Sequence, residues 1–518
     1  MKRNIIILFA CCMIAASCTD FLNVTKEKDQ TEGTYFKTDI DAVSSLEEVF
    51  NNLFTQSDYT FSRGLAYEIL GGSDDAIFGR TRNADFYRII NFESDGTEAA
   101  TRNTWIAFTR VLQRANWIIY NLLRKSSLTP VESRCLGEAY FGRAFAHFYT
   151  AYRYGTVNQG VPFDRYEDYD YYPYEIPVQR ASVIENYELI ISDLEKSLEL
   201  VPWHEEYTPA DYGRTHKAVV LGYMVKTYAY WAQHDPSKWA LIPALVDRIE
   251  NEGHRALWDN YADAFTIANN WGKEHMLSIN STKENYSESC WFPSVVLDNG
   301  GWGKINGWGF FKPTLSLRNE FTENDKRRPI CILEYGDKFS YFGEERTYYS
   351  TVDLESGFQF GKYMDAYRHE PYPTQECTDL NPPIMRFAEM LLFKAEALIM
   401  QNKNAEAGPV LSRISARGDG TVYTSPTMDD LKHERRCELA GEQTDRLMDL
   451  KRWGDYDKLR APKLGRHYEN RADPTSTWTP VEIWPARTFD PAKNMVLPYD
   501  PVEVLKADGA LKQNSGYN

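Results

Sequence analysis

Cysteine is scarce in this chain of 518 residues, and its spacing excludes two common uses of the residue. Three of the eight cysteines lie near the N-terminus, at positions 11, 12 and 18. The other five are widely spaced, with no Cys-x-x-Cys among them: Cys135, Cys290, Cys331, Cys377 and Cys437. An odd number at such spacing fits neither a disulfide framework nor a zinc site. We therefore expect these five to be mostly small, buried hydrophobic side chains.

The signatures of several other protein classes are also missing. No basic run occurs, and the formal net charge is -16, which argues against a nucleic-acid partner. The nine histidines form no His-Glu-x-x-His pair, so a histidine metal site is not expected. No Gly-x-Ser-x-Gly elbow occurs, which removes the commonest signature of a serine hydrolase. We expect no cofactor.

The first residues have the pattern of a lipoprotein signal. Met1-Lys2-Arg3 precedes an apolar run over 5–16, which is too short to span a bilayer. Small residues then lead to Cys18, the position at which lipoprotein processing needs a thiol to take up diacylglycerol. We predict a signal peptide over 1–17 and lipidation of Cys18; an ordinary signal with a chance cysteine is the alternative. No later apolar stretch approaches the length of a membrane span, so we expect a soluble mature body.

Helical patterns dominate the chain before residue 254. Capping boxes at 129–132 and 182–185 predict helices that end near Gly155 and Pro202. Apolar residues at helical spacing predict two more helices, over 105–123 and from Thr215 onward. In the helix that begins at 129, one apolar stripe consists of Phe141, Ala144, Phe145, Phe148 and Tyr152.

The rest of the chain divides into an irregular part and a second helical part. Between residues 254 and 380, Gly, Pro, Asn and aromatic residues replace long helical patterns, with short strand-like pieces such as 330–335. Beyond it, a helix is predicted from Ile384 to Leu398 and a charged one from about Met428 to Trp453. We predict a mainly α fold of tetratricopeptide-like helix pairs over 18–253 and 381–518. The loop-rich part, 254–380, is predicted to bind ligand and to contain a few short strands.

Several short motifs follow one another in an informative order. The predicted mature chain opens Cys18-Thr19-Asp20-Phe21-Leu22, and residues 113–116 read Gln-Arg-Ala-Asn downstream of Trp105. Residues 386–397 contain Arg-x-Ala-Glu and Ala-Glu-Ala, and 434–453 contain Glu-Arg, Glu-Leu, Glu, Arg, Asp-Leu and Arg-Trp in order. Together, nearly from Cys18 to the last residue, the chain resembles the SusD/RagB family of nutrient-binding outer-membrane lipoproteins. Tyr499 and Ser515 depart from that family's usual Ile and Pro near its end.

The resemblance implies a binding function at the cell surface. Such proteins look like lids over a SusC-like TonB-dependent transporter, held in the outer membrane by the lipid on Cys18, and they do not catalyse. We therefore predict a cell-surface lipoprotein that captures oligosaccharide and delivers it to that transporter. A peptide-binding member of the same uptake system, a secreted glycoside hydrolase and a purely structural helical adaptor are the alternatives. The carboxylates of 434–449 alternate with arginines, which favours ion pairs over glycosidase chemistry, so we predict no catalytic residue.

The sharpest local feature is a group of tryptophans, Trp291, Trp302 and Trp308, the last two within the glycine-rich segment 300–311. Exposed aromatic faces with polar neighbours suit stacking on the apolar C–H faces of sugar rings. The neighbouring glycines leave the indoles uncrowded and permit positive φ. The segment also corresponds broadly to the place where the resembled family has ligand-stacking aromatics. Packing of one or both of these loop tryptophans into the core is the alternative.

A second set of predicted ligand contacts is polar. Asp74 and Asp75, followed by Arg80 and Arg82, resemble a family loop that donates polar contacts to ligand. Carboxylate and guanidinium groups supply the directional acceptors and donors that a sugar hydroxyl requires. An Asx turn or surface salt bridges would account for the same residues.

Overall fold

The structure is a computed structural model that describes residues 36–54, 61, 64–79, 84–170, 180, 182–285, 288–297, 307–349, 356–367, 377–471, 473 and 475–517. The predicted signal peptide and Cys18 lie outside these ranges. Within them, no helix combines the length and the apolar character that crossing a bilayer requires.

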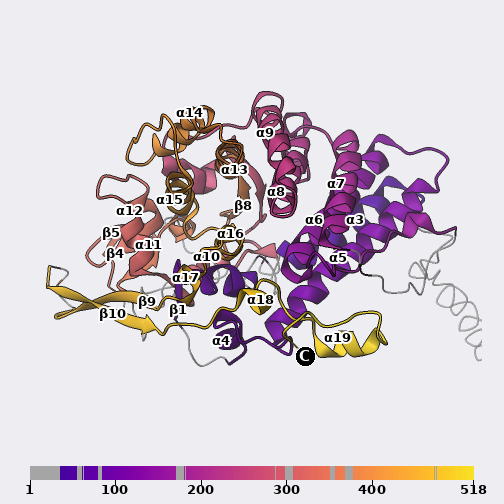
Figure 1. Cartoon of the computed structure of the whole chain (residues 1–518). Coiled ribbons are helices and arrows are strands. Elements are labelled where there is room, and N and C mark those ends of the chain that lie inside the picture. The colour runs from indigo at the N-terminus through magenta and orange to yellow at the C-terminus, as the bar shows by residue number, and fades with distance from the viewer. Residues whose placement is uncertain are drawn as a thin grey trace, which may run out of the picture.

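The N-terminal half is a wall of helices in which each packs on its neighbour in sequence, as predicted (Figure 1). Helix α5 packs against α6, α6 against α7, α7 against α8 and α8 against α9, while α3 lies on both α5 and α6. The bounds are α3 Asp39–Phe54, α4 Ala84–Ile90, α5 Ala99–Leu123, α6 Pro130–Tyr154, α7 Val183–Leu200, α8 Lys217–Trp231 and α9 Ile242–Asn251.

Helix α6 is the centre of this wall. Both arms of its predicted capping box form between Thr129 and Glu132, and the helix ends at Gly155. Every residue from Cys135 to Tyr154 is buried, rather than one stripe, because α3, α5 and α7 all pack around it. Gly142 permits this approach, since a Cβ there would come within 2.9 Å of Val49.

The strands form five two-stranded antiparallel sheets in the described chain, consistent with the predicted few short strands. Two pairings join distant segments: β1 with β3, and β2 with β8. The others are β4 with β7, β5 with β6, and β9 with β10. The bounds are β1 Ala76–Phe78, β2 His275–Ser278, β3 Phe311–Pro313, β4 Ile332–Glu334, β5 Lys338–Tyr341, β6 Glu344–Thr347, β7 Phe358–Phe360, β8 Pro383–Arg386, β9 Lys463–Tyr468 and β10 Trp478–Trp484.

Two predictions about the remaining helices, α10 to α19, were wrong. Ile384 belongs to strand β8 and not to the following helix, because β2 pairs with this segment. The predicted charged helix is two helices, interrupted at Gly441 with φ 73° and restarted where the Asp445 side chain accepts from the Met448 amide. The bounds are α10 Phe292–Val296, α11 Leu315–Glu320, α12 Arg328–Cys331, α13 Phe387–Met400, α14 Asn404–Ser415, α15 Met428–Leu439, α16 Arg446–Trp453, α17 Tyr456–Arg460, α18 Pro491–Asn494 and α19 Pro501–Lys506.

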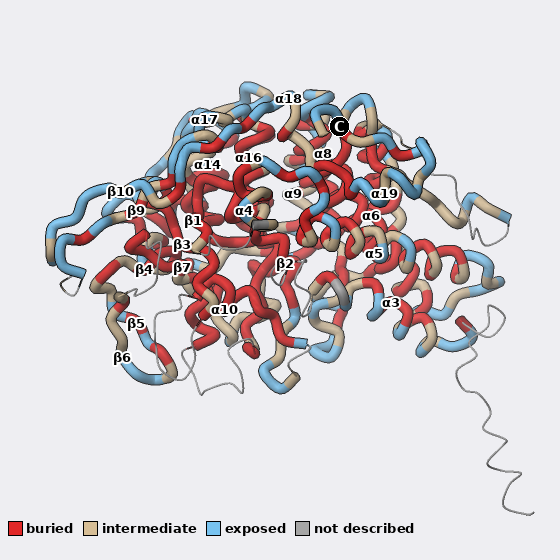
Figure 2. Tube along the Cα trace, turned by 90° about the horizontal axis from the view of Figure 1, so that it is seen from below, coloured by how far each residue is buried: buried red, intermediate tan, exposed pale blue. Residues whose placement is uncertain are grey.

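A continuous buried interior joins the helical wall to the loop-rich part (Figure 2). The buried segments run through the middle of the molecule, and exposed segments lie around its edge. All five cysteines beyond the N-terminal segment are free and buried, which confirms their predicted role as small interior groups.

Candidate ligand-binding site

Strand pairing brings two of the predicted ligand-contact segments together. In the β1–β3 pair, Ala76 lies opposite Pro313 and Phe78 opposite Phe311. The Gly79 amide donates to the Phe310 carbonyl at 2.8 Å, which extends the pairing by one residue. The segment after Asp74 and Asp75 therefore meets the end of the glycine-rich tryptophan segment, although more than 230 residues of sequence separate them.

Aromatic rings from five segments gather at this junction. We refer to them as the aromatic cluster: Tyr67, Phe78, Phe86, Trp291, Trp308, Phe310 and Phe311. Trp308 lies 5.5 Å from Trp291 and 5.4 Å from Phe310 between ring centroids. Most of the cluster is buried, whereas Trp308 and Phe86 are half-buried. The cluster is therefore a group of packed aromatic rings in which Trp308 and Phe86 keep solvent-accessible surface.

The backbone around Trp308 is held by hydrogen bonds to helix α10 and the residue after it. The Trp308 amide donates to the Ser294 carbonyl at 2.8 Å, and the Gly309 amide donates to the Leu297 carbonyl at 2.9 Å. Gly309 has φ 62°, the conformation for which the sequence predicted glycine. At Gly307, a Cβ would lie 1.9 Å from the Leu297 carbonyl oxygen. Both glycines are therefore required by the path that positions Trp308.

The other predicted aromatic and basic contacts have different outcomes. Trp291 is buried, with 7% of its surface exposed, and packs against the Trp308 ring. Trp302, Arg80 and Arg82 lie outside the residues that the structure describes.

Asp74 and Asp75, predicted to contact ligand, are interior groups that pair with arginines. Asp74 is 7% exposed and Asp75 is 3% exposed. Arg446 contacts Asp74 at 3.0 Å, and Arg436 contacts Asp75 at 2.8 Å. Burial alone would raise the pKa of Asp74, but the two guanidinium charges hold it well below its usual value. These carboxylates join the loop to α15 and α16, so we do not place them in the ligand site.

The charged α15 and α16 segment forms buried ion pairs, as its alternating sequence predicted. Arg386 from β8 donates to Glu442 at 2.6 Å and to Glu438 at 3.1 Å. Arg327 reaches Glu434 at 2.8 Å from the loop-rich part. These carboxylates are compensated by cations in the interior and are closed to a glycan chain.

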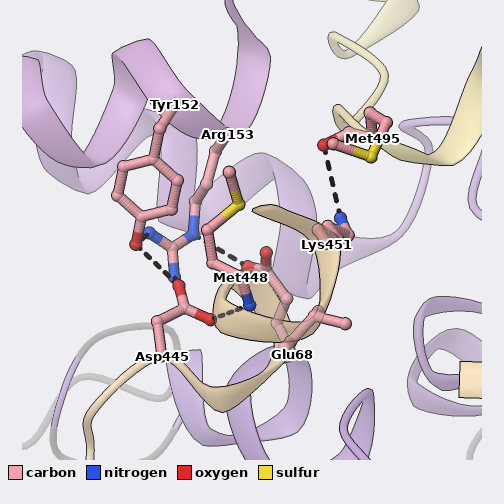
Figure 3. Close-up of a pocket in the computed structure, with 8 residues that line it drawn as sticks. Glu68, Tyr152, Arg153, Asp445, Met448, Lys451 and Met495 are labelled. Carbon is pink, nitrogen blue, oxygen red and sulfur yellow. Dashed lines mark hydrogen bonds and ion pairs between the residues drawn. The ribbon is translucent and has the colours of Figure 1, made fainter. Parts of the chain in front are cut away.

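A small cavity between α6 and α16 is also interior (Figure 3). Its volume is ≈ 10 Å³, room for about one water molecule and too small for a sugar. Arg153 contacts Glu68 at 3.0 Å and Asp445 at 2.8 Å there. Across the cavity, the Lys451 ammonium donates to the Met495 carbonyl at 3.4 Å, and burial lowers the pKa of that lysine.

A cleft of ≈ 490 Å³ between α3, α6 and β2 was not predicted from the sequence. Its lining includes Phe54, Tyr212, Arg214 and Asn280. No short motif marks these residues, because they come from three separate segments. The half-buried Tyr212 lies in a stretch of Tyr, Pro and acidic residues, and this composition was the one available signal.

Comparisons with known proteins agree with this architecture. SusD-like protein P38 of Formosa agariphila is 24% identical over 466 residues, covering 82% of this chain and 86% of that protein. A SusD-like protein of Bacteroides fragilis has the same fold, with a TM-score of 0.79 and 18% identity over 94% of this chain and 99% of its own. Surface glycan-binding protein A of Bacteroides thetaiotaomicron, solved in complex with laminarihexaose, has a TM-score of 0.70 and 19% identity, with coverage of 91% and 98%.

Two family models together cover most of the chain. One, described as the SusD family, matches residues 256–517. The other, described as starch-binding associating with outer membrane, matches residues 20–228. Since the first of these spans half of the sequence and the second covers most of the remainder, the chain belongs to the SusD/RagB family.

Proposed function

We propose that the protein is a cell-surface glycan-binding lipoprotein that captures oligosaccharide and delivers it to a SusC-like TonB-dependent transporter of the outer membrane. The family consists of carbohydrate-binding proteins and not of enzymes, so a glycoside hydrolase is not proposed. The observation that supports the proposal is Trp308, a half-buried indole that packs on Trp291 and Phe310. A ring fixed in this way loses little conformational entropy when a sugar stacks on it.

Replacing Trp308 with Ala is expected to weaken oligosaccharide binding by about fivefold to tenfold, or about 1–1.4 kcal/mol, because one stacking face is lost. Isothermal titration should begin with laminarihexaose, the ligand of a solved relative, and extend to other neutral hexasaccharides and to peptides. Trp308→Phe retains a flat ring and should retain most of the affinity.

The matched control for this substitution is Trp478→Ala. Trp478 is 39% exposed on β10, in a separate two-stranded sheet, and its removal should leave binding unchanged. A lower melting temperature of Trp308→Ala with unchanged affinity would instead support the structural-adaptor alternative. Binding of peptides alone would favour the peptide-binding alternative.

The proposed membrane anchor has its own test. Replacing Cys18 with Ala removes the thiol that would carry the lipid, so the protein is expected to leave the membrane fraction. Immunoblots of soluble and membrane fractions measure this directly, with Cys12→Ala as the matched control that should remain in the membrane. Retention of the Cys18→Ala protein in the membrane fraction would contradict anchoring through this residue.

A further inference from the structure

The cleft between α3, α6 and β2 has the size and the mixed lining of a ligand pocket. One wall is apolar and comes from two helices, with Leu46, Phe50 and Phe54 on α3 and Phe141 on α6. Its volume of ≈ 490 Å³ lies within the range of about 300–1,000 Å³ that is usual for small-molecule sites. The cleft and the aromatic cluster have no lining residue in common among those described.

The opposite wall contains an amide whose orientation is fixed. The Trp271 indole N–H donates to Asn280 Oδ1 at 3.0 Å. An indole nitrogen is a donor only, so the oxygen of the Asn280 amide faces Trp271, and its NH₂ group lies beside Gly213, which also lines the cleft. No acceptor for that NH₂ group occurs among the residues that the structure describes.

Two unusual backbone conformations hold this amide in place. Trp271 has φ 55°, a left-handed conformation that is uncommon for a bulky residue. Gly213 has φ 94°, and a Cβ at that position would lie 2.0 Å from Asn280 Nδ2. The left-handed conformation is strained only at Trp271, and strained non-glycine residues concentrate at binding sites, where they position a side chain before the ligand arrives.

Tyr212 adds a flat, half-buried ring beside the amide. It stacks on His204, with ring centroids 4.9 Å apart and planes 26° apart, and lies 6.2 Å from the Trp271 ring. Neighbouring Arg214 is held by Asp211, with Nε to Oδ1 at 3.0 Å. The segment 211–214 therefore supplies an aromatic face and a fixed cation to the same cleft.

The described lining of the cleft contains three carboxylates, Glu47, Glu138 and Glu288, and one cation, Arg214. Glu47 and Glu288 are exposed lining residues, and neither forms an ion pair with another described residue. The third lining carboxylate, Glu138, is buried and lies 3.2 Å from Arg134 and 3.8 Å from Arg214. An uncharged ligand avoids repulsion from the two exposed carboxylates and can donate hydroxyl protons to them.

We propose that this cleft is a second glycan site, separate from the site at Trp308, and that it binds a neutral sugar unit. The sugar stacks on Tyr212, one of its hydroxyl oxygens accepts from the Asn280 amide, and Phe50 and Phe54 contact its apolar face. The inference rests on the proposed function in its choice of sugar as ligand. When one glycan chain binds two sites on the same protein, its first contact raises its effective concentration at the second site. The overall affinity then increases without a stronger contact at either site.

Titration of the full-length protein with laminarihexaose, maltohexaose and hexagalacturonate tests this site. We expect the neutral hexasaccharides to bind and the acidic one to bind at least tenfold more weakly. Asn280→Ala and Tyr212→Ala should each weaken neutral binding about fivefold, and Tyr212→Phe should retain it. Gly213→Ala displaces the amide without removing it and should resemble Asn280→Ala. Thr424→Ala, at an exposed position outside the cleft lining, is the matched control.

The outcomes separate this inference from the proposed function. Wild-type affinity in Asn280→Ala and Tyr212→Ala, with loss in Trp308→Ala, would overturn the second site and leave glycan capture intact. Loss in the cleft variants with none in Trp308→Ala would place binding in the cleft alone, and tight binding of hexagalacturonate would overturn neutral selectivity. Failure of the wild type to bind any of the sugars would overturn both proposals. Melting temperatures identify a variant that has lost its fold, for which Tyr212→Leu and Asn280→Asp replace the alanine changes.

Discussion

Replacement of Arg386 with Met is expected to lower the free energy of unfolding by about 3–5 kcal/mol, because it leaves buried carboxylates without their shared cation. Arg386 is 1% exposed and donates to Glu442 through two nitrogens, at 2.6 and 2.8 Å. It also reaches Glu438 at 3.1 Å and forms an ion pair with Glu274. Arg417 and Lys362 contact the same carboxylates and can offset only part of the loss.

Equilibrium unfolding in urea measures this effect. Arg386→Lys keeps the charge but loses the planar fork that spans two carboxylates, so it should also destabilise the protein, by less than Met. The matched control is Arg248→Ala, which breaks the exposed pair between Arg248 and Glu252 and should change stability by less than about 1 kcal/mol. A change in Arg386→Met no larger than that in Arg248→Ala would show that this network contributes little to stability.

The sequence predicted well those features that depend on neighbouring residues. The capping boxes at Thr129 and Ser182 form as expected, because each consists of a residue and its third successor along the chain. The alternation of charges on α15 and α16 likewise indicated ion pairs. It did not identify their partners, because Glu274, Lys362 and Arg386 come from the loop-rich part and β8.

Features that depend on contacts between segments distant in sequence were predicted poorly. Asp74 and Asp75 lie in a polar stretch that is typical of a surface loop. Their ion pairs with Arg436 and Arg446 offset the desolvation cost of burying two carboxylates. The glycines near Trp308 gave a usable signal, since a left-handed residue leaves a trace in the local sequence. For the cleft, the composition around Tyr212 was the one available signal and Asn280 had none, because 68 positions separate the two residues. Trp271, which lies between them in sequence, orients the Asn280 amide in space.

The ion-pair network also connects the loop-rich part to the C-terminal helical part. Glu438 on α15 meets Arg386 on β8 and Arg417 beyond α14, and Glu274 in turn joins Arg417 to the start of β2. The β2 end carries Leu277 and Ser278 into the cleft lining, with Asn280 directly after it. Loss of the network is therefore expected to loosen the β2 side of the cleft as well as the contact between the loop-rich part and the C-terminal helical part.

Protonation of Glu438 at low pH is expected to break its ion pairs in this network. Burial alone would raise the pKa of Glu438, but the charges of Arg417, Arg386 and Arg327 lower it to about 2 from its ordinary value of 4.5. A carboxylate with a depressed pKa contributes its full stabilisation above pH 4.5, and that contribution is lost as pH falls through about 2. At about 1.4 kcal/mol per pKa unit, the wild type should lose about 3 kcal/mol over that window through this one group.

Urea unfolding from pH 6 down to pH 2 in the wild type and in Glu438→Gln measures the contribution. The variant starts less stable, because a neutral amide cannot satisfy three guanidinium groups, but its stability should fall less steeply below pH 4.5. Glu188→Gln, on the exposed side of α7, is the matched control and should follow the slope of the wild type. If Glu438→Gln also falls as steeply as the wild type, other carboxylates control the acid transition. A shallower slope confined to this variant would assign the transition to the junction between the loop-rich part and the C-terminal helical part, next to the β2 side of the cleft.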